Sequence, residues 1–278
     1  MEVTSVEAVP LRRDLDERFA NAQKWIDSRE YCLVRVEADD GTVGWGECWG
    51  PVAGNRELLE RRVGPWLVGR DPRAVERLHD ELVFDLRSAY HSTVPTGVVS
   101  GVDVALWDLR GRALGESVAS LLGGRRRDEV RAYATGHFFR DVDSFDRLRT
   151  AFAEEAASHV AAGFDAVKAK IGLGRHFPEW GAGEDVDLVR AVREAVGDDV
   201  RVMADANHAY DRATARRVAD GLADLDAFFL EEPMPPEQVD AYAALNAAVD
   251  VPLAGGECWA FREEFDRVLD AGAVDYVQ

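Results

Sequence analysis

The sequence predicts an α+β domain over residues 1–130, followed by a (β/α) domain with a parallel sheet over residues 131–278. Three observations lead to this fold class. In the first part, segments typical of strands precede segments typical of helices, as in α+β proteins. In the second part, short apolar strands alternate with amphipathic helices, which implies parallel strands joined by right-handed crossovers. Each strand–helix unit has about the 30-residue length of a unit in a (β/α)₈ barrel.

The first domain opens with strands and continues with helices. We expect strands over residues 3–9, 31–38 and 42–47. Asp39-Asp40-Gly41, between the last two strands, is a hairpin turn signal. Helices are expected over residues 72–89 and 98–114. Gly115 is suited to ending the second helix, because glycine readily adopts the left-handed conformation found at helix ends.

The second domain is a series of strand–helix units. Strands are expected over residues 131–136, 166–171, 201–206, 227–230, 251–254 and 274–277. Helices are expected over residues 141–162, 184–196, 212–223, 235–248 and 261–271. A doubly wound open sheet is the competing arrangement. No Gly-x-Gly-x-x-Gly motif follows the first strand of the series, which weakens a dinucleotide-binding interpretation.

The composition indicates a globular protein and argues against some classes of partner. Hydrophobic residues make up 47% of 278 residues, enough for a sizeable core. The net charge of −19 argues against nucleic acid as a partner, because phosphate binding needs clustered cations. The sequence has neither an apolar run of about 20 residues nor a secretion signal, so we expect a cytoplasmic protein with no membrane association.

The lysine content is unusually low. Lys24, Lys168 and Lys170 are the only lysines among 33 basic residues, and the rest are arginines. An acidic surface that is poor in lysine is typical of proteins that work in high salt, where screening reduces self-repulsion. We therefore expect a halophilic protein. A GC-rich genome that favours arginine codons is the alternative explanation.

Three acidic residues occupy equivalent places in successive units of the second domain. Asp205, Glu231 and Glu257 each lie at or just after the carboxyl end of a predicted strand, and 26 residues separate each from the next. The carboxyl ends of parallel barrel strands meet on one face, so these carboxylates should converge. Together they would repel one another without a cation, which indicates a Mg²⁺ site. Capping of the following helices could explain any one of them.

Lys168 and Lys170 form a second signal. Two residues apart on a strand, they point to the same side, inward if Ala166, Val167, Ala169 and Ile171 pack outward against helices. Two adjacent ammonium groups should lower each other's pKa, which would make one of them available as a base. A solvated edge strand is the alternative, but it fits poorly in a chain with so few lysines.

Three further polar residues are candidates for binding a substrate. Asn207 follows Asp205 on the same side, where its amide could contact a substrate or a metal-bound oxygen. A role as a turn residue is an equally good interpretation. His137 follows the first strand of the second domain, and His208 is next to Asn207. Both are candidate substrate ligands, although a structural role is the more common one for a single histidine.

These residues together resemble the mandelate racemase/muconate-lactonizing branch of the enolase superfamily. Five motifs carry the resemblance, in order along the chain: Val104 to Arg112 continuing to Leu121-Leu122-Gly123-Gly124, Val167 to Gly172, Asp205-Ala206-Asn207, Glu231-Glu232-Pro233 and Gly256-Glu257. The resemblance implies an α+β capping domain on a modified (β/α)₇β barrel. It also implies Mg²⁺ held by Asp205, Glu231 and Glu257, with Lys170 as acid/base and Lys168 in electrostatic support.

The resemblance further implies an enzyme that removes the proton α to a carboxylate and passes through an enolate. The Glu-Glu-Pro and Gly-Glu motifs are more similar to those of mandelate racemase and sugar-acid dehydratases than to the Glu-Gln-Pro and Asp-Glu of cycloisomerases. A lyase that dehydrates an aldonic or aldaric acid to a 2-keto-3-deoxy acid is therefore expected. A racemase or epimerase with the same enolate chemistry is the alternative.

One part of the family pattern is missing from the sequence. A His–Asp dyad on the sixth and seventh strands would supply the second acid/base, but the sequence ends at Gln278, at the start of the sixth predicted strand. We therefore expect an incomplete barrel from a longer enzyme, which would be a homo-oligomer at full length. A non-catalytic truncated relic is the interpretation from another functional class.

Overall fold

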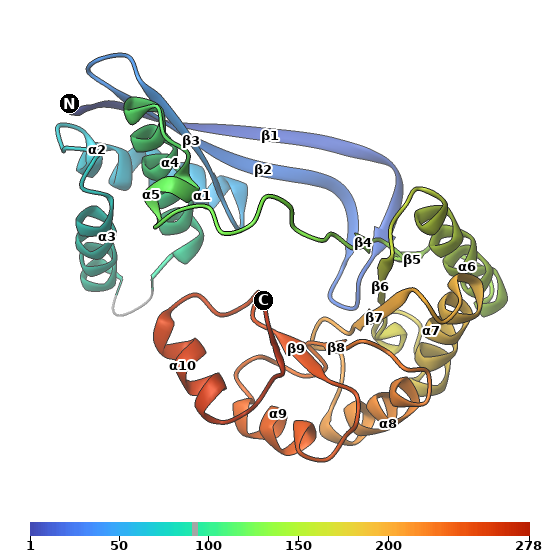
Figure 1. Cartoon of the computed structure of the whole chain (residues 1–278). Helices are drawn as coiled ribbons and strands as arrows, with labels where there is room; N and C mark the ends of the chain where they lie inside the picture. Colours follow the sequence, from blue (N-terminus) through green and yellow to red (C-terminus); the bar gives the residue numbers. More distant parts are fainter. Residues whose placement is uncertain (91–93) are drawn as a thin grey trace. The chain divides into compact units, whose positions relative to one another are not determined.

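The computed structural model describes residues 1–90 and 94–278, which form two compact units (Figure 1). The first unit comprises Met1–Leu15 and Ser28–Val130, and the second comprises Asp16–Asp27 and Arg131–Gln278. The segment Asp16–Asp27 thus groups with the second unit, although we had placed all of residues 1–130 in one domain. Over the described ranges, no helix has both the length and the apolar character needed to cross a membrane.

In the first unit, an antiparallel sheet packs against helices. Its strands are β1 (Val3–Ala20), β2 (Trp25–Ala38) and β3 (Val43–Cys48), in the order β3-β2-β1. The helical segments are α1 (Val52–Leu58), a π-helix (Leu59–Val63), α2 (Gly64–Leu67), α3 (Val75–Ala89), α4 (Thr96–Leu114) and α5 (Val118–Leu121). The β2–β3 hairpin and the two long helices confirm the predictions, and Gly115 ends α4 with a φ of 68°. The helical turns between Val52 and Leu67 had not been predicted.

Strand β3 lies unusually close to helix α4. A Cβ atom added to Gly44 would lie 2.1 Å from the carbonyl oxygen of Ala105, and one added to Gly46 would lie 2.0 Å from that of Gly101. Both glycines are therefore required by the close approach of two backbones. Around this contact, the apolar faces of β2, α3 and α4 form the core of the first unit.

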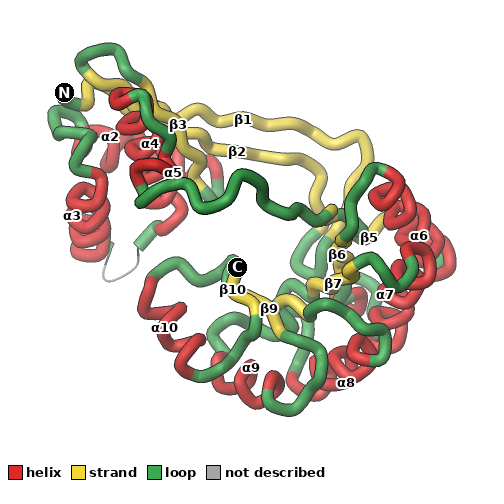
Figure 2. The backbone as a smooth tube through the Cα atoms, in the orientation of Figure 1, coloured by secondary structure: helices red, strands yellow, loops and turns green. Residues whose placement is uncertain are grey.

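The second unit contains a parallel sheet of six strands. These strands are β4 (Ala134–Thr135), β6 (Ala166–Lys170), β7 (Arg201–Asp205), β8 (Leu230–Glu231), β9 (Leu253–Gly255) and β10 (Tyr276–Val277). They lie side by side in the order β10-β9-β8-β7-β6-β4. The helices are α6 (Phe145–Ala161), α7 (Ala182–Val196), α8 (Arg212–Ala223), α9 (Val239–Asn246) and α10 (Arg262–Asp270), with a 3₁₀ turn at Leu173–Arg175. They line the outer side of the curved sheet (Figure 2).

The predicted strand–helix series is confirmed, with shorter strands in places. The first, fourth and sixth strands each have only two residues in the sheet, and the fourth is shifted to Leu230–Glu231. The short strand β5 (Phe139–Arg140) had not been predicted. It pairs antiparallel with the end of β1, so that Ala20 lies opposite Phe139.

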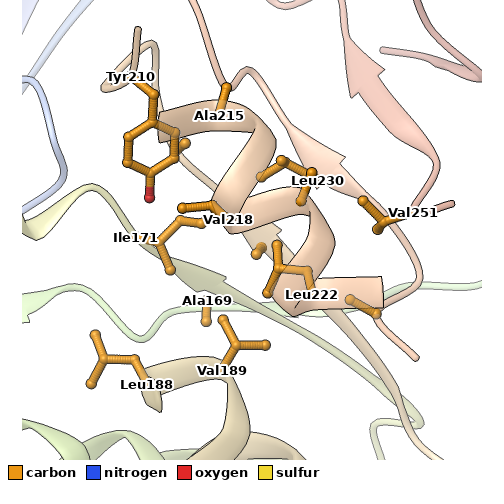
Figure 3. Close-up of a cluster of buried hydrophobic side chains, with 14 of the residues drawn as sticks. Ala169, Ile171, Leu188, Val189, Tyr210, Ala215, Val218, Leu222, Leu230 and Val251 are labelled. Carbon is orange, nitrogen blue, oxygen red and sulfur yellow. The ribbon is translucent and has the colours of Figure 1, made fainter. Parts of the chain in front are cut away.

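The two faces of the parallel sheet differ in chemistry. On the helix side, Ala169 and Ile171 pack with α7 and α8 side chains such as Val189 and Val218 (Figure 3). On the inner side, Ala166 groups with Met203, Phe229 and Ala254 in a small apolar cluster. The prediction that Ala166 packs outward is therefore wrong, because the alternation of the strand puts it on the same side as Lys168.

Candidate active site

The carboxyl ends of three neighbouring strands bring four charged side chains together. The register places Lys170 of β6 opposite Asp205 of β7, and Asp205 opposite Glu231 of β8. Lys168, Asp205 and Glu231 are at most 6% exposed, and Lys170 is 8% exposed. A polar layer therefore lies beyond the apolar cluster of the inner face, at the sheet edge where barrel enzymes carry their sites.

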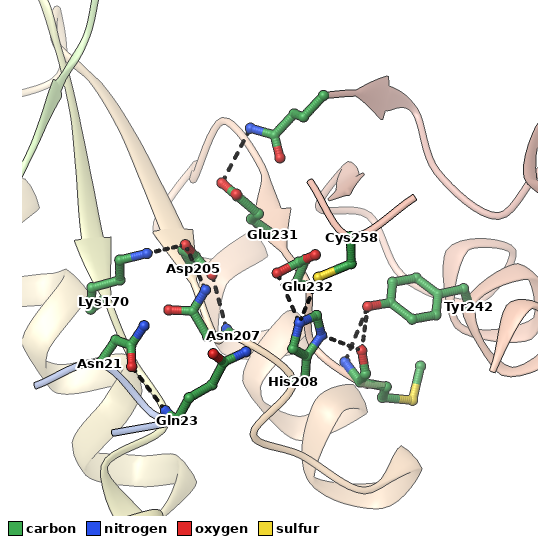
Figure 4. Close-up of polar contacts among 12 residues, drawn as sticks. Asn21, Gln23, Lys170, Asp205, Asn207, His208, Glu231, Glu232, Tyr242 and Cys258 are labelled. Carbon is green, nitrogen blue, oxygen red and sulfur yellow. Dashed lines mark hydrogen bonds and ion pairs between the residues drawn. The ribbon is translucent and has the colours of Figure 1, made fainter. Parts of the chain in front are cut away.

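Within this carboxylate–lysine cluster, the charges pair across the strands. Lys168 Nζ lies 2.5 Å from Glu231 Oε2 and 3.9 Å from Asp205 Oδ2. Lys170 Nζ donates to Asp205 Oδ2 (Figure 4). Burial alone would lower the pKa of Lys168, but Glu231 and Asp205 outweigh it and raise the pKa above its ordinary value. A lowered lysine pKa beside a bound metal stays a prediction, because in this structure the two carboxylates pair with the lysines.

The third predicted ligand lies apart from this cluster. Glu257 is in an exposed turn two residues beyond β9, and it does not form a three-ligand group with Asp205 and Glu231 among the described residues. Its charge instead acts on Glu232, which is 2% exposed. The complete ligand set remains a prediction.

Glu232 is a buried acid that the sequence analysis overlooked. Burial, followed by the negative charges of Glu257, Asp205 and Glu231, raises its pKa to about 8. Its Oε2 lies 3.2 Å from His208 Nε2, which in turn lies 3.5 Å from Cys258 Sγ. The doubled Glu-Glu of the motif was the signal that could have identified it. Glu232 was missed because a residue directly after an inward-facing ligand is normally expected to point outward.

Asn207 lies beside Asp205, as predicted. Its backbone N–H donates to Asp205 Oδ1 at 2.9 Å and its side-chain amide donates to Oδ2 at 3.3 Å, while its own Oδ1 is buried without a hydrogen-bond partner. Asn207, His208 and Glu232 all have positive φ values, of 39°, 65° and 43°. Such conformations are costly for residues other than glycine and are concentrated at functional sites.

The two candidate histidines have different surroundings. His208 lies near the cluster, with Nδ1 3.2 Å from the Met234 carbonyl, so Nε2 faces Glu232. His137 is fully buried, and its ring contacts Phe152 and His159 of α6. These contacts place the ring on the helix side of the sheet, and a substrate contact by His137 stays a prediction.

Asp185 of α7 positions the loop that follows the lysine strand. Its Oδ1 accepts the N–H groups of Gly172 and Leu173 at 2.8 and 3.0 Å, and its Oδ2 accepts the Tyr210 hydroxyl at 2.7 Å. Burial raises the pKa of Asp185 in spite of these donors. The sequence did not single out this residue, because acids in the first turn of a helix, here Glu184 and Asp185, are ordinary.

A hard divalent cation fits the donor set of the carboxylate–lysine cluster. Asp205 and Glu231 offer buried carboxylate oxygens, and Asn207 Oδ1 is an unpartnered oxygen beside them. Oxygen donors of this kind are the ligands that Mg²⁺ prefers. In the structure, the positive charges of Lys168 and Lys170 balance the two carboxylates. A bound cation would add to this balancing charge.

Comparison with known proteins finds a matching family for each of the two units. Residues 5–123 match the family described as "Mandelate racemase / muconate lactonizing enzyme, N-terminal domain", and residues 151–278 match "Enolase C-terminal domain-like". The chain is 44% identical to D-galactarolactone cycloisomerase of Agrobacterium fabrum over 278 residues, covering 100% of this chain and 71% of that protein. It is 33% identical to arabinonate dehydratase of Saccharolobus solfataricus over 267 residues, covering 95% of this chain and 69% of that protein.

A solved structure agrees with these relatives. The 3,6-anhydro-D-galactonate cycloisomerase of Zobellia galactanivorans superimposes with a TM-score of 0.87 and 33% identity, and the match covers 100% of this chain and 72% of that chain. Family profiles, curated relatives and three-dimensional likeness thus agree over both units. The chain belongs to the mandelate racemase/muconate lactonizing enzyme family of the enolase superfamily.

Proposed function

We propose that this chain carries the proton-abstracting site of a Mg²⁺-dependent lyase that dehydrates a sugar acid. The observation that carries the proposal is the buried carboxylate–lysine cluster at the carboxyl ends of β6, β7 and β8. Supporting it, a relative at 33% identity is a dehydratase of the sugar acid arabinonate. The whole enzyme, with a capping domain and a modified (β/α)₇β barrel, forms part of the proposal.

Lys170 is the better candidate for the base. Within the described part of the chain, its one ion pair is with Asp205, whereas Lys168 is held by both Glu231 and Asp205 and its pKa is raised. In its neutral form, Lys170 Nζ would accept the proton α to the substrate carboxylate. The enolate would then expel the β hydroxyl group as hydroxide, which takes up a proton to leave as water, and the resulting enol would tautomerise to the 2-keto acid. Lys168 would remain charged and oppose the build-up of negative charge beside Glu231.

Asp205, Glu231 and Glu257 would hold the Mg²⁺, and Asn207 would orient a substrate oxygen. When bound, the cation supplies positive charge that stabilises the enolate. Glu257 would have to turn inward from its exposed turn to join the set. The Gly256 next to it, with a φ of 145°, has the backbone freedom of the left-handed region for such a change.

A second candidate reaction is favoured by the 44% identity to D-galactarolactone cycloisomerase. If the enzyme is a cycloisomerase, the dehydratase activity that we expected from the Glu-Glu-Pro and Gly-Glu motifs is wrong. The chemistry is closely related, because an enolate can expel a ring oxygen from its β carbon as readily as a hydroxyl group. A racemase, which returns the proton without losing a β substituent, remains the alternative with the same first step.

Proton abstraction can be tested directly. Purified protein is incubated with Mg²⁺ in D₂O with aldonic acids, aldaric acids and their lactones, and NMR measures deuterium at the α carbon and any new product. We expect exchange or elimination that is lost in Lys170→Met and in excess chelator. A 2-keto-3-deoxy product supports the dehydratase, a ring-opened lactone supports the cycloisomerase, and an inverted α carbon supports the racemase.

The control is His79→Ala, which removes a half-exposed side chain of the first unit that is paired with Asp103. It should react as the unmodified protein does. Activity that survives in Lys170→Met would remove Lys170 from the base role, and activity that survives in chelator would remove the metal from the proposal. Absence of all turnover in folded protein would favour the non-catalytic interpretation.

A further inference from the structure

A second group of metal-binding side chains lies on the helix side of the sheet. His137 follows β4, while Glu155 and His159 stand one turn apart on α6. One ligand atom from each of the three lies within 4.8 Å of the others. The His137 ring touches Phe152, which belongs to the helix-side core, so this group is separate from the carboxylate–lysine cluster of the inner face.

Two imidazole nitrogens in this group are buried without a partner. Neither His137 Nε2 nor His159 Nε2 has a hydrogen bond to any described residue. His137 Nδ1 lies 3.3 Å from the carbonyl oxygen of Lys168. Because a carbonyl can only accept, the ring proton is on Nδ1 and the Nε2 lone pair is free. An unsatisfied buried polar atom is costly, so two such atoms at one place point to a ligand.

Glu155 supplies a negative charge at the same place. Its Oε1 accepts the His137 backbone N–H at 3.0 Å and lies 3.7 Å from His159 Nε2, while Oε2 accepts from Arg140 at 2.7 Å. Burial opposes ionisation, but the His137 N–H and the Arg140 guanidinium outweigh it and hold the pKa of Glu155 below its usual range. Burial lowers the pKa of His137. Ionised carboxylate and neutral imidazole are the forms that bind metals.

The backbone leaves space for this arrangement at Gly136. A Cβ atom at this position would lie 2.4 Å from Glu155 Oε1 and 3.2 Å from His159 Nε2. Glycine therefore leaves room for both ligand atoms in their present positions, whereas a larger residue would displace the Glu155 carboxylate. The side chains of Glu155 and His159 are 22% and 27% exposed, which gives an ion a route from solvent.

We propose that His137, Glu155 and His159 bind a transition-metal ion of the zinc type. Two imidazole nitrogens and one carboxylate oxygen suit Zn²⁺ better than Mg²⁺, with water in the fourth position. The spacing of Glu155 and His159 by four residues puts both on one face of α6. Through His137 Nδ1 and the Lys168 carbonyl, the ion would tie α6 to the start of the sheet and to the lysine strand.

A competing group in the same unit must be separated from this site. His208, Glu232 and Cys258 also bring ligand atoms within 4.8 Å of one another, and a thiol would attract Zn²⁺. The experiment therefore uses a Cys258→Ser background, with excess Mg²⁺ present to occupy the carboxylate–lysine cluster. Zn²⁺ is titrated calorimetrically, and the thermal unfolding midpoint is recorded with and without Zn²⁺.

In this background we expect one Zn²⁺ per chain and a higher unfolding midpoint. His159→Ala and Glu155→Gln should each weaken Zn²⁺ binding by more than about 100-fold, beyond the effect expected for an outer-shell partner. His79→Ala is the matched control and should bind as the background does. Circular dichroism of the metal-free variants establishes that each is folded, and Glu155→Gln preserves the side-chain shape.

Two outcomes would overturn the proposal. The first is that folded protein shows no measurable Zn²⁺ binding, which would mean that the three side chains do not form a metal site. The second is unchanged affinity in both His159→Ala and Glu155→Gln, which would place the bound ion elsewhere. Because the readouts are binding and stability, failure of this proposal is distinguishable from failure of the proposed lyase activity.

Discussion

Glu231 is the residue on which the proposed Mg²⁺ site depends most. It is 1% exposed, and its pKa is raised by burial and by the neighbouring Asp205. Glu231→Gln keeps the shape but removes the charge, so Mg²⁺ affinity should fall by more than about 100-fold, beyond the effect of losing an outer-shell partner. Isothermal titration measures this, with exposed Glu263→Gln as the matched control. Equal affinity in both variants would mean that the ligand set is wrong.

Glu232 should make the stability of the metal-free protein depend on pH. Its pKa is raised from 4.5 to about 8, so the folded state holds a proton that the unfolded state releases. The contribution of Glu232 to the free energy of unfolding is fully present below pH 4.5 and is lost as the pH rises through about 8. Glu232→Gln stays neutral, so its unfolding midpoint should rise relative to the unmodified protein across this window.

The measurement is thermal unfolding in chelator at several pH values, with Glu263→Gln as the control. A constant difference between Glu232→Gln and the unmodified protein would show that the Glu232 pKa is not raised. The test is selective because Glu263 lies in the exposed first turn of α10 and has the same charge change.

Individual residues differ in how far the sequence predicts their place. Lys168, Lys170, Asp205 and Glu231 could be placed because strand alternation and strand ends are visible in the pattern of apolar residues. Glu257 and His137 could not, because backbone conformation after the strand end decides where each side chain points. This conformation depends on tertiary packing, which a local pattern does not contain.

The loop after β6 is the element whose geometry the site needs most. Asp185 holds it through two backbone N–H groups and the Tyr210 hydroxyl. Asp185→Ala should lower the free energy of unfolding by about 3 kcal/mol or more, because hydrogen bonds to a charged group are strong and their donors would be left buried. Tyr210→Phe removes only one of these bonds and should cost about 1 kcal/mol. Denaturant unfolding of both variants measures the difference, and equal losses would contradict the anchoring role.

At the level of elements, most helices and strands were predictable, since their apolar periodicity is strong. Helix α8 has the predicted bounds, 212–223, because Asp211 caps its start through the Thr214 N–H. The turns from Val52 to Leu67 and strand β5 were not predictable. β5 exists only because its two residues find a partner at the end of β1, far away in the sequence.

At the scale of the whole molecule, two electrostatic effects oppose each other as salt is added. The net charge of −19 repels itself, and screening relieves this repulsion. Surface ion pairs such as Arg56–Glu60 and Arg216–Asp220 are weakened by the same screening. Exposed pairs of this type contribute little to stability, so relief of the repulsion should dominate.

The thermal unfolding midpoint should therefore rise as potassium chloride increases from low to molar concentration. Most of the rise should occur while the Debye length falls from about 30 to about 10 Å, because long-range repulsion is screened first. Sodium chloride at equal ionic strength is the control for a specific ion effect and should give the same curve. A midpoint that falls with salt would mean that the ion pairs dominate, and it would favour arginine-rich codon usage over adaptation to high salt.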